Sequence, residues 1–84
     1  MDMAKHTIVL RREGMQGFLS DQCIETDAIN AMSTMPGVKN PMIVSESESQ
    51  VTVSFDWIGK EPFMQAGQHL LRYGLSTVLW KYGQ

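Results

Sequence analysis

The chain has 84 residues, a formal net charge of −2 at pH 7 and one cysteine, with acidic and basic residues interspersed. This length predicts a single domain over residues 1–84, and the lack of a long apolar stretch, a basic cluster or a basic amphipathic helix argues against a membrane or a nucleic acid as partner. Because the lone Cys23 cannot form an intrachain disulfide and residues 1–6 lack the apolar core of a signal peptide, we expect a cytoplasmic protein.

The first predicted element is a strand over residues 6–12, which are rich in β-branched and aliphatic side chains. Ile8 and Leu10 would point to one face of the sheet, and the residues between them to the other. The glycines of residues 14–17 then interrupt the pattern and predict a loop.

A helix follows this loop, because apolar residues recur at helical spacing. Ser20 or Asp21 is predicted as its N-cap, whose side-chain oxygen accepts a hydrogen bond from a backbone N–H. The helix should stop at residues 35–37, since proline disfavours helical geometry in the residue before it. Its predicted apolar stripe consists of Ile24, Ala28, Ala31, Met32 and Met35. Most of the seven methionines are interpreted as gap-filling core or loop residues.

Two strands are predicted next, joined by a polar hairpin turn over residues 45–50. The first covers residues 42–44, and Pro41 should lie at an edge or outside the ladder. The second, residues 51–57, alternates apolar and polar side chains, which is typical of a strand with one buried face. Trp57 falls on the apolar side, where we expect the helices to cover it.

The last two predicted elements are a helix that begins near Pro62 and a strand over residues 75–82, with Gly74 as the C-cap between them. In the strand, Val78 and Trp80 should alternate with their neighbours. The apolar face of the helix would consist of Phe63, Ala66, Gly67, Leu70 and Tyr73. The order predicts an α+β, ferredoxin-like β-α-β-β-α-β sandwich, with two helices on one face of a four-stranded antiparallel sheet.

Several segments carry a family pattern, in order and at comparable spacing. Residues 28–38 close an apolar helix with Met-Pro-Gly-Val, similar to Leu-Pro-Gly-Val; residues 51–56 are similar to Val-Thr-Val-x-Tyr-Asp, and residues 72–74 to Ala-Gly-Tyr. With Met15 closing the first strand, the chain resembles the heavy-metal-associated domains of copper chaperones, mercury-binding proteins and metal ATPases. The resemblance covers nearly the whole chain. It implies the ferredoxin-like fold and a soft ion such as Cu(I), held by the two thiolates of a Met-x-Cys-x-x-Cys motif.

The chain departs from this family at the metal motif. The two thiol positions of the family motif can be located by counting forward from Met15 or back from residues 35–38. The two counts differ by four residues, so the loop before the first helix should be about four residues longer than usual. The two pairs of positions are Gly17 with Ser20, and Asp21 with Ile24. Neither pair is cysteine, and Cys23 lies one residue before the second helix-anchored position.

Three candidate sites remain to be compared. Cys23 with Met15 could hold a soft metal such as copper, or two chains could share one ion through paired Cys23 residues. His6 and His69 have no zinc-type spacing and are expected to be solvent-facing or hydrogen-bonded. Residues 14–18 also resemble the phosphate loop of acylphosphatases, which implies an arginine inside the loop and an asparagine to place water. Asn40 could serve as the asparagine, but Arg11 and Arg12 precede the loop, so the cation for the developing charge is missing.

From these features we expect a small, non-enzymatic interaction domain without a cofactor. It would contact a protein partner or a second copy of itself through the sheet or through residues 14–20. The alternative is a soft-metal binding or trafficking protein that uses Cys23 with Met15, as a monomer or a dimer. An acylphosphatase-like enzyme is the second alternative.

Overall fold

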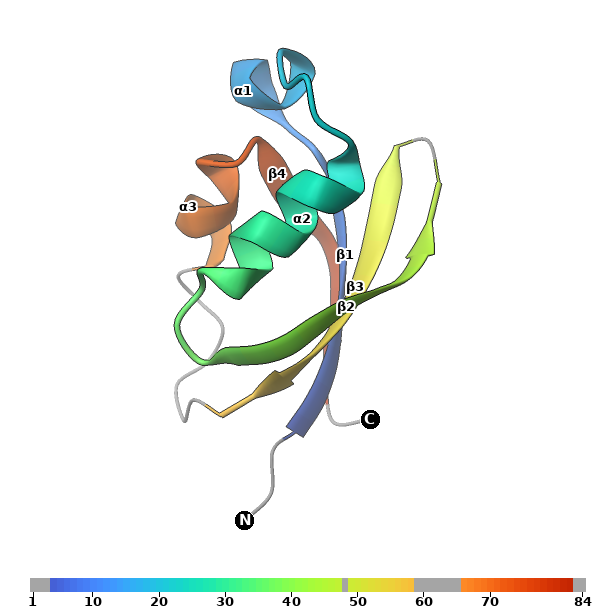
Figure 1. Ribbon diagram of the computed structural model, residues 1–84, viewed down its shortest axis with the longest axis vertical. Coiled ribbons are helices and arrows are strands. Elements are labelled where there is room, and N and C mark those ends of the chain that lie inside the picture. Colours follow the sequence, from blue (N-terminus) through green and yellow to red (C-terminus); the bar gives the residue numbers. More distant parts are fainter. Residues whose placement is uncertain (1–3, 48, 59–65, 83–84) are drawn as a thin grey trace.

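A computed structural model describes residues 4–47, 49–58 and 66–82 (Figure 1). In chain order the described elements are β1 (Ala4–Arg12), α1 (Gly14–Phe18), α2 (Ile24–Ser33), β2 (Val38–Glu46), β3 (Gln50–Trp57), α3 (Ala66–Leu71) and β4 (Leu75–Tyr82). The strands form one antiparallel sheet in the order β2-β3-β1-β4, and α2 and α3 lie on the same face of it (Figure 1). The predicted α+β class and four-stranded antiparallel sheet are confirmed, and the architecture is compatible with a ferredoxin-like fold.

The core lies between the sheet and the two longer helices. Ile8 and Leu10 of β1 are fully buried and stand opposite Val53 and Val51 of β3, as the alternation of both strands predicts. The predicted stripe of the first long helix is buried at every position: Ile24, Ala28, Ala31, Met32 and Met35. Trp57 is half-buried against the same core. The apolar pattern therefore assigned the inner face of the sheet and of α2 correctly.

Both edge strands contain extra residues. The pairing of β2 with β3 shifts register between Lys39 and Met42 and again between Ile43 and Ser45, so β2 extends well beyond the predicted residues 42–44. Pro41 lies within the first irregularity of this edge strand, as expected for a proline in a sheet. In β4 a similar shift leaves Val78 between two registers, so Val78 and Leu79 are both exposed and the predicted alternation is wrong there.

A glycine with positive φ lies in the turn after each of the two longer helices, and α2 itself ends at Ser33 with Thr34 as its C-cap, just before the predicted stop at residues 35–37. Gly37 (φ 89°) follows α2, and a Cβ at this position would lie 2.8 Å from the ring of Trp57. Gly74 (φ 73°) lies in the turn between the end of α3 at Leu71 and β4, and its N–H donates to the carbonyl of Leu71 at 3.0 Å, as expected for a glycine that closes a helix. The predicted start of α3 at Pro62, and Phe63, lie outside the described residues. From the predicted apolar face, Leu70 is fully buried and Tyr73 packs against the core.

Candidate functional site

The segment after β1, where the family resemblance places a metal motif, folds into the short helix α1. The predicted loop over residues 14–17 is thus wrong, and Met15 lies on α1 instead of closing β1, which ends at Arg12. Gly17 packs so closely that a Cβ here would lie 2.5 Å from the carbonyl oxygen of Gly74. The N–H of Glu13 donates to that same oxygen at 2.9 Å. Because a helix this short is unstable by itself, these tertiary contacts stabilise it.

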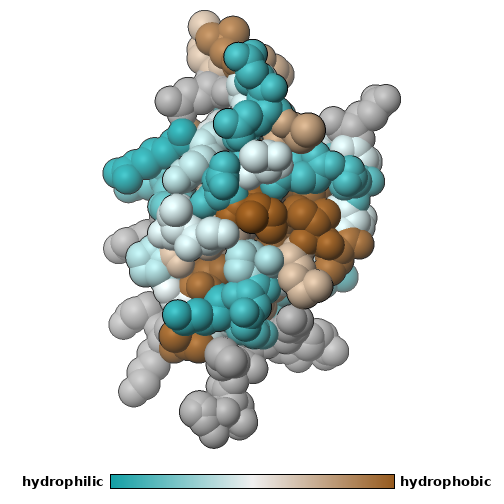
Figure 2. All heavy atoms as spheres, in the orientation of Figure 1, coloured by the Kyte–Doolittle hydropathy of each residue, from teal (hydrophilic) through white to brown (hydrophobic). Residues whose placement is uncertain are grey.

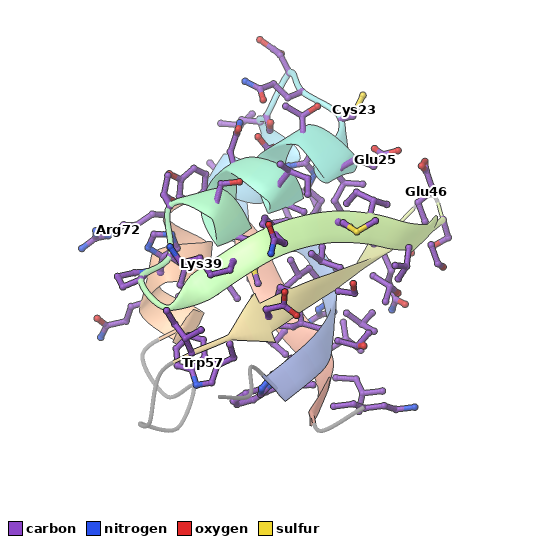
Figure 3. All side chains as sticks on the ribbon, turned by 60° about the horizontal axis from the view of Figure 1, so that its bottom comes forward. Cys23, Glu25, Lys39, Glu46, Trp57 and Arg72 are labelled. Atoms are coloured by element: carbon purple, nitrogen blue, oxygen red, sulfur yellow. The ribbon has the colours of Figure 1, made fainter. Side chains whose placement is uncertain are left out.

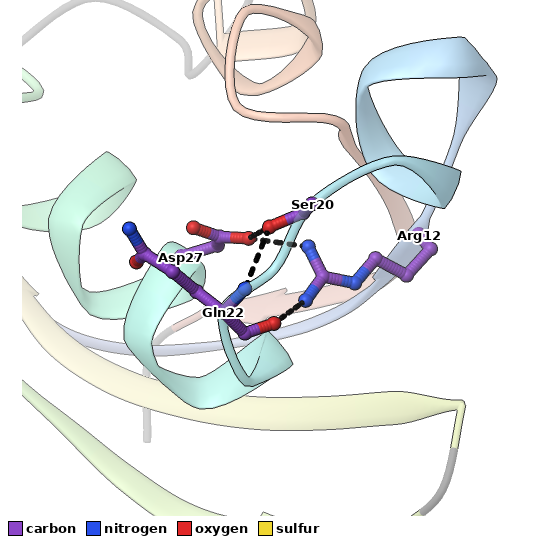
Figure 4. A network of polar contacts seen from close by, with 4 residues as sticks. All are labelled: Arg12, Ser20, Gln22 and Asp27. Carbon is purple, nitrogen blue, oxygen red and sulfur yellow. Dashed lines mark hydrogen bonds and ion pairs between the residues drawn. The ribbon is translucent and has the colours of Figure 1, made fainter.

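A polar network joins the end of β1 to α2 (Figure 4). The guanidinium of Arg12 is paired with the carboxylate of Asp27 and donates to the carbonyl oxygen of Gln22 at 2.6 Å. The Ser20 hydroxyl donates to Asp27 at 2.7 Å and accepts from the N–H of Gln22 at 3.2 Å. The side chains of Arg12 and Asp27 are only 19% and 11% exposed, so water screens this pair weakly. The network fixes the segment that separates α1 from α2.

Cys23 is the N-cap residue of α2, and its side chain is exposed. The predictions that Ser20 or Asp21 caps this helix are therefore wrong, since Ser20 bonds to Asp27 and Cys23 makes no side-chain capping bond. The positions predicted for a thiol pair do not form a site: Gly17 is part of α1, Ser20 belongs to the polar network, Asp21 is exposed and Ile24 is buried. Over the described ranges, no three His, Cys, Asp or Glu side chains could hold a metal ion together.

Three large apolar side chains at this end of the molecule are exposed. They are Met15, Phe18 and Leu19, with exposed fractions of 74%, 78% and 71%, and we call them the apolar tip. Figure 1 places α1 at one end of the molecule, and Figure 2 shows hydrophobic surface there. Met32 and Met35 fill the core as predicted, whereas Met15 does not. Neighbouring exposed apolar side chains on one fixed segment are typical of an interaction site.

Two carboxyl groups meet beside Cys23. Glu25, in the first turn of α2, and Glu46, at the end of β2, lie next to each other (Figure 3). The hydrogen bond between them, together with the charge of Glu25, raises the pKa of Glu46, and the same hydrogen bond lowers the pKa of Glu25. The pair therefore carries one negative charge while the two groups share a proton and two once both are ionised, close to the start of α2.

The residues offered for an acylphosphatase-like reaction are not brought together. Arg11 forms an ion pair with Glu13 at 3.2 Å, and Arg12 is held by the network described above. Asn40 lies on β2, beyond the C-terminal end of α2, where its amide donates to Asp56 at 3.2 Å. Arg12 contacts the first turn of the same helix, so it and Asn40 lie at opposite ends of α2.

His6 is buried among aromatic rings and makes a hydrogen bond. Its ring stacks on Phe55 and on Trp80, with centroid separations of 5.4 and 5.8 Å. The indole N–H of Trp80 donates to Nδ1 of His6 at 3.1 Å, so that nitrogen carries no proton. Burial lowers the pKa of His6 below its ordinary value near 6.5. Of the two expected alternatives, solvent-facing or hydrogen-bonded, the structure shows the hydrogen-bonded one for His6.

Acid should weaken the fold through His6. Between the lowered folded pKa and the unfolded value near 6.5, the unfolded chain binds a proton that the folded chain does not, so stability falls as the pH drops through this window. The contribution is at most about 1.4 kcal/mol per pH unit. Urea unfolding at pH about 7.5 and about 5.5 should show a smaller pH effect in His6→Gln than in the wild type. An equal pH effect in both proteins would contradict this prediction, because all other titrating groups are shared.

His69 has a separate structural role at the C-terminal end of α2. Its Nε2 lies 2.9 Å from the carbonyl oxygen of Ala31 and 3.0 Å from Oγ1 of Thr34. The hydroxyl of Tyr73 lies 3.2 Å from the same Thr34 atom. These contacts join α3 and the turn after it to the C-terminal end of α2, where backbone carbonyls lack partners within the helix. The two histidines thus make separate contacts, on different elements.

No described helix is both long enough and apolar enough to span a bilayer. Comparisons with family models, curated proteins and solved structures found no match for this chain.

Proposed function

We propose that this chain is a non-enzymatic interaction domain that binds another protein through the apolar tip. The exposure of Met15, Phe18 and Leu19 carries the proposal. The tip stands on a segment held by the contact of Gly17 with Gly74 and by the Arg12 network, so it would lose little conformational freedom on binding.

The size of the tip favours a reversible contact. Three side chains of this kind, about three-quarters exposed, offer on the order of 400 Å² of apolar surface. Each partner in a standard stable interface buries about 800 Å². A partner would therefore need further contacts around the tip to bind tightly.

We further infer that the sheet and helices form a ferredoxin-like domain related in arrangement to the heavy-metal-associated family. The antiparallel order β2-β3-β1-β4 and the position of α2 and α3 on one face support this assignment. In this comparison α1 replaces the segment that carries the metal motif of that family. The interaction surface would then occupy the place where the family binds its cargo.

Replacing Phe18 with serine should abolish binding without weakening the fold. Because the side chain is exposed, the free energy of unfolding should stay within about 0.5 kcal/mol of the wild type.

A benzophenone amino acid at position 15, activated by light in cells that produce the chain, should give a discrete cross-linked adduct. Phe18→Ser in the same chain should remove that adduct.

Position 78 is a matched control for cross-linking, since Val78 is an exposed apolar residue on β4, away from α1. Equal adducts from positions 15 and 78, or an adduct that survives Phe18→Ser, would contradict the proposal. An adduct with twice the mass of the chain would identify the partner as a second copy.

A second candidate function is soft-metal binding by Cys23 with Met15. The observation that favours it is the exposed thiol at the N-cap of α2, at the same end of the molecule as α1 (Figures 1 and 3). Titration of the reduced protein with Cu(I) against a competing chelator, beside Cys23→Ser, tests it. Tight binding lost in the variant would favour metal binding, and equal weak binding by both proteins would exclude this site.

A further inference from the structure

The end of the molecule that carries the apolar tip has an excess of negative charge. Both arginines here are already paired: Arg11 with Glu13, and Arg12 with Asp27. The carboxyl groups of this end that have no paired cation within the described residues are Asp21, Glu25 and Glu46. A partner that approaches the tip therefore meets a negative potential.

These carboxyl groups lie on the side of the tip that faces α2. Asp21 is exposed and follows Leu19 by two residues in the connecting segment. Figure 3 shows Glu25 and Glu46 together at the start of α2, and Figure 1 places this part of α2 at the same end as α1. Two carboxyl groups held side by side repel each other when both are ionised, and a cation from a partner would relieve that repulsion.

A matching partner must offer apolar surface and positive charge together. Nucleic acids and anionic membrane surfaces carry the wrong charge for this end of the molecule. We propose that the apolar tip binds a protein segment in which apolar and basic side chains stand side by side, such as one face of a basic amphipathic helix. This inference rests on the proposed function and adds the chemistry of the partner to it.

Two synthetic helical peptides with the same leucine positions test the inference, one with lysine and the other with glutamate at the polar positions. Each is titrated into the isotopically labelled protein, and the backbone amide shifts of the apolar tip are followed by NMR. We expect the lysine peptide to bind about tenfold more tightly than the glutamate peptide, with a ratio that falls as salt is added. The double variant Glu25→Gln, Glu46→Gln should reduce the ratio to about threefold.

Asp56→Asn is the matched control, because Asp56 lies on β3 near Trp57, away from the tip, and should leave the ratio unchanged. Equal affinity of both peptides for the tip overturns the charge inference while the proposed function stands. If neither peptide shifts the tip amides, the inference is overturned. The proposed function is overturned separately, by the absence of a cross-linked adduct at position 15 in the otherwise unchanged chain. Co-sedimentation with phosphatidylglycerol vesicles that Phe18→Ser abolishes would assign the tip to a lipid surface instead.

Discussion

Gly17→Ala is expected to lower the free energy of unfolding by about 2 kcal/mol, although alanine is the better helix former by about 1 kcal/mol. The new methyl group would lie 2.5 Å from the carbonyl oxygen of Gly74. That oxygen belongs to the backbone and accepts a hydrogen bond from Glu13, so it cannot rotate away as a flexible side chain would. Either α1 or the turn after α3 has to move. Urea unfolding, followed by tryptophan fluorescence, measures the loss.

Met15→Ala on the same short helix is the matched control. Its side chain is exposed, so the free energy of unfolding should change by less than about 0.5 kcal/mol. A Gly17→Ala protein as stable as the wild type, or more stable, would mean that helix propensity outweighs the packing of α1 against Gly74.

Asp27→Ala should lower the free energy of unfolding by about 3 kcal/mol, because it leaves two half-buried donors, the guanidinium of Arg12 and the hydroxyl of Ser20, without their acceptor. The carboxylate of Asp27 accepts from both Arg12 and Ser20. Removing it leaves the charge of Arg12 at a site that is only 19% exposed, where water compensates it poorly. The cost should appear as a lower midpoint in thermal and urea unfolding.

A double-mutant cycle separates the pair from its surroundings. Arg12→Met and Asp27→Leu should each lower the free energy of unfolding. The double variant should lose at least about 1 kcal/mol less than the sum of the two single losses. Ser20→Ala removes the hydrogen bond to the Asp27 carboxylate and the one from the N–H of Gln22, but leaves the ion pair intact, so it should lower the free energy of unfolding by less than Asp27→Ala does, about 2 kcal/mol. Additive losses for Arg12 and Asp27 would show that the ion pair contributes nothing of its own.

The strands and α2 could be predicted because their apolar periodicity is a property of neighbouring residues. Ile8 and Leu10 alternate along β1, and the apolar residues from Ile24 to Met35 follow the helical repeat. The buried face of each element can therefore be predicted from residues close together in the sequence. The turn at Gly74 could also be predicted locally, because glycine adopts a positive φ without strain. Trp57 was placed correctly because its strand alternates cleanly.

The candidate site could be predicted only in outline. The segment after β1 was recognised as unusual, yet α1 depends on Gly17 packing against Gly74, a contact between residues far apart in the sequence. The pairing of Arg12 with Asp27 arises only once β1 and α2 are packed together. Serine is a common N-cap residue, which is why the sequence predicts Ser20 as the cap. The folded chain instead brings Asp27 within hydrogen-bond distance of its hydroxyl, which the sequence does not indicate. Five residues are also too few for periodicity to show that Phe18 points into solvent.

The bulges of the two edge strands bear on how this protein behaves at high concentration. An exposed edge with apolar side chains such as Met42 and Val44 is a template on which other chains can add strands and aggregate. In β2 and β4 the register shifts interrupt the row of free backbone groups that such growth requires. The irregular edges therefore oppose fibrous self-assembly even though apolar side chains stay exposed on both edge strands.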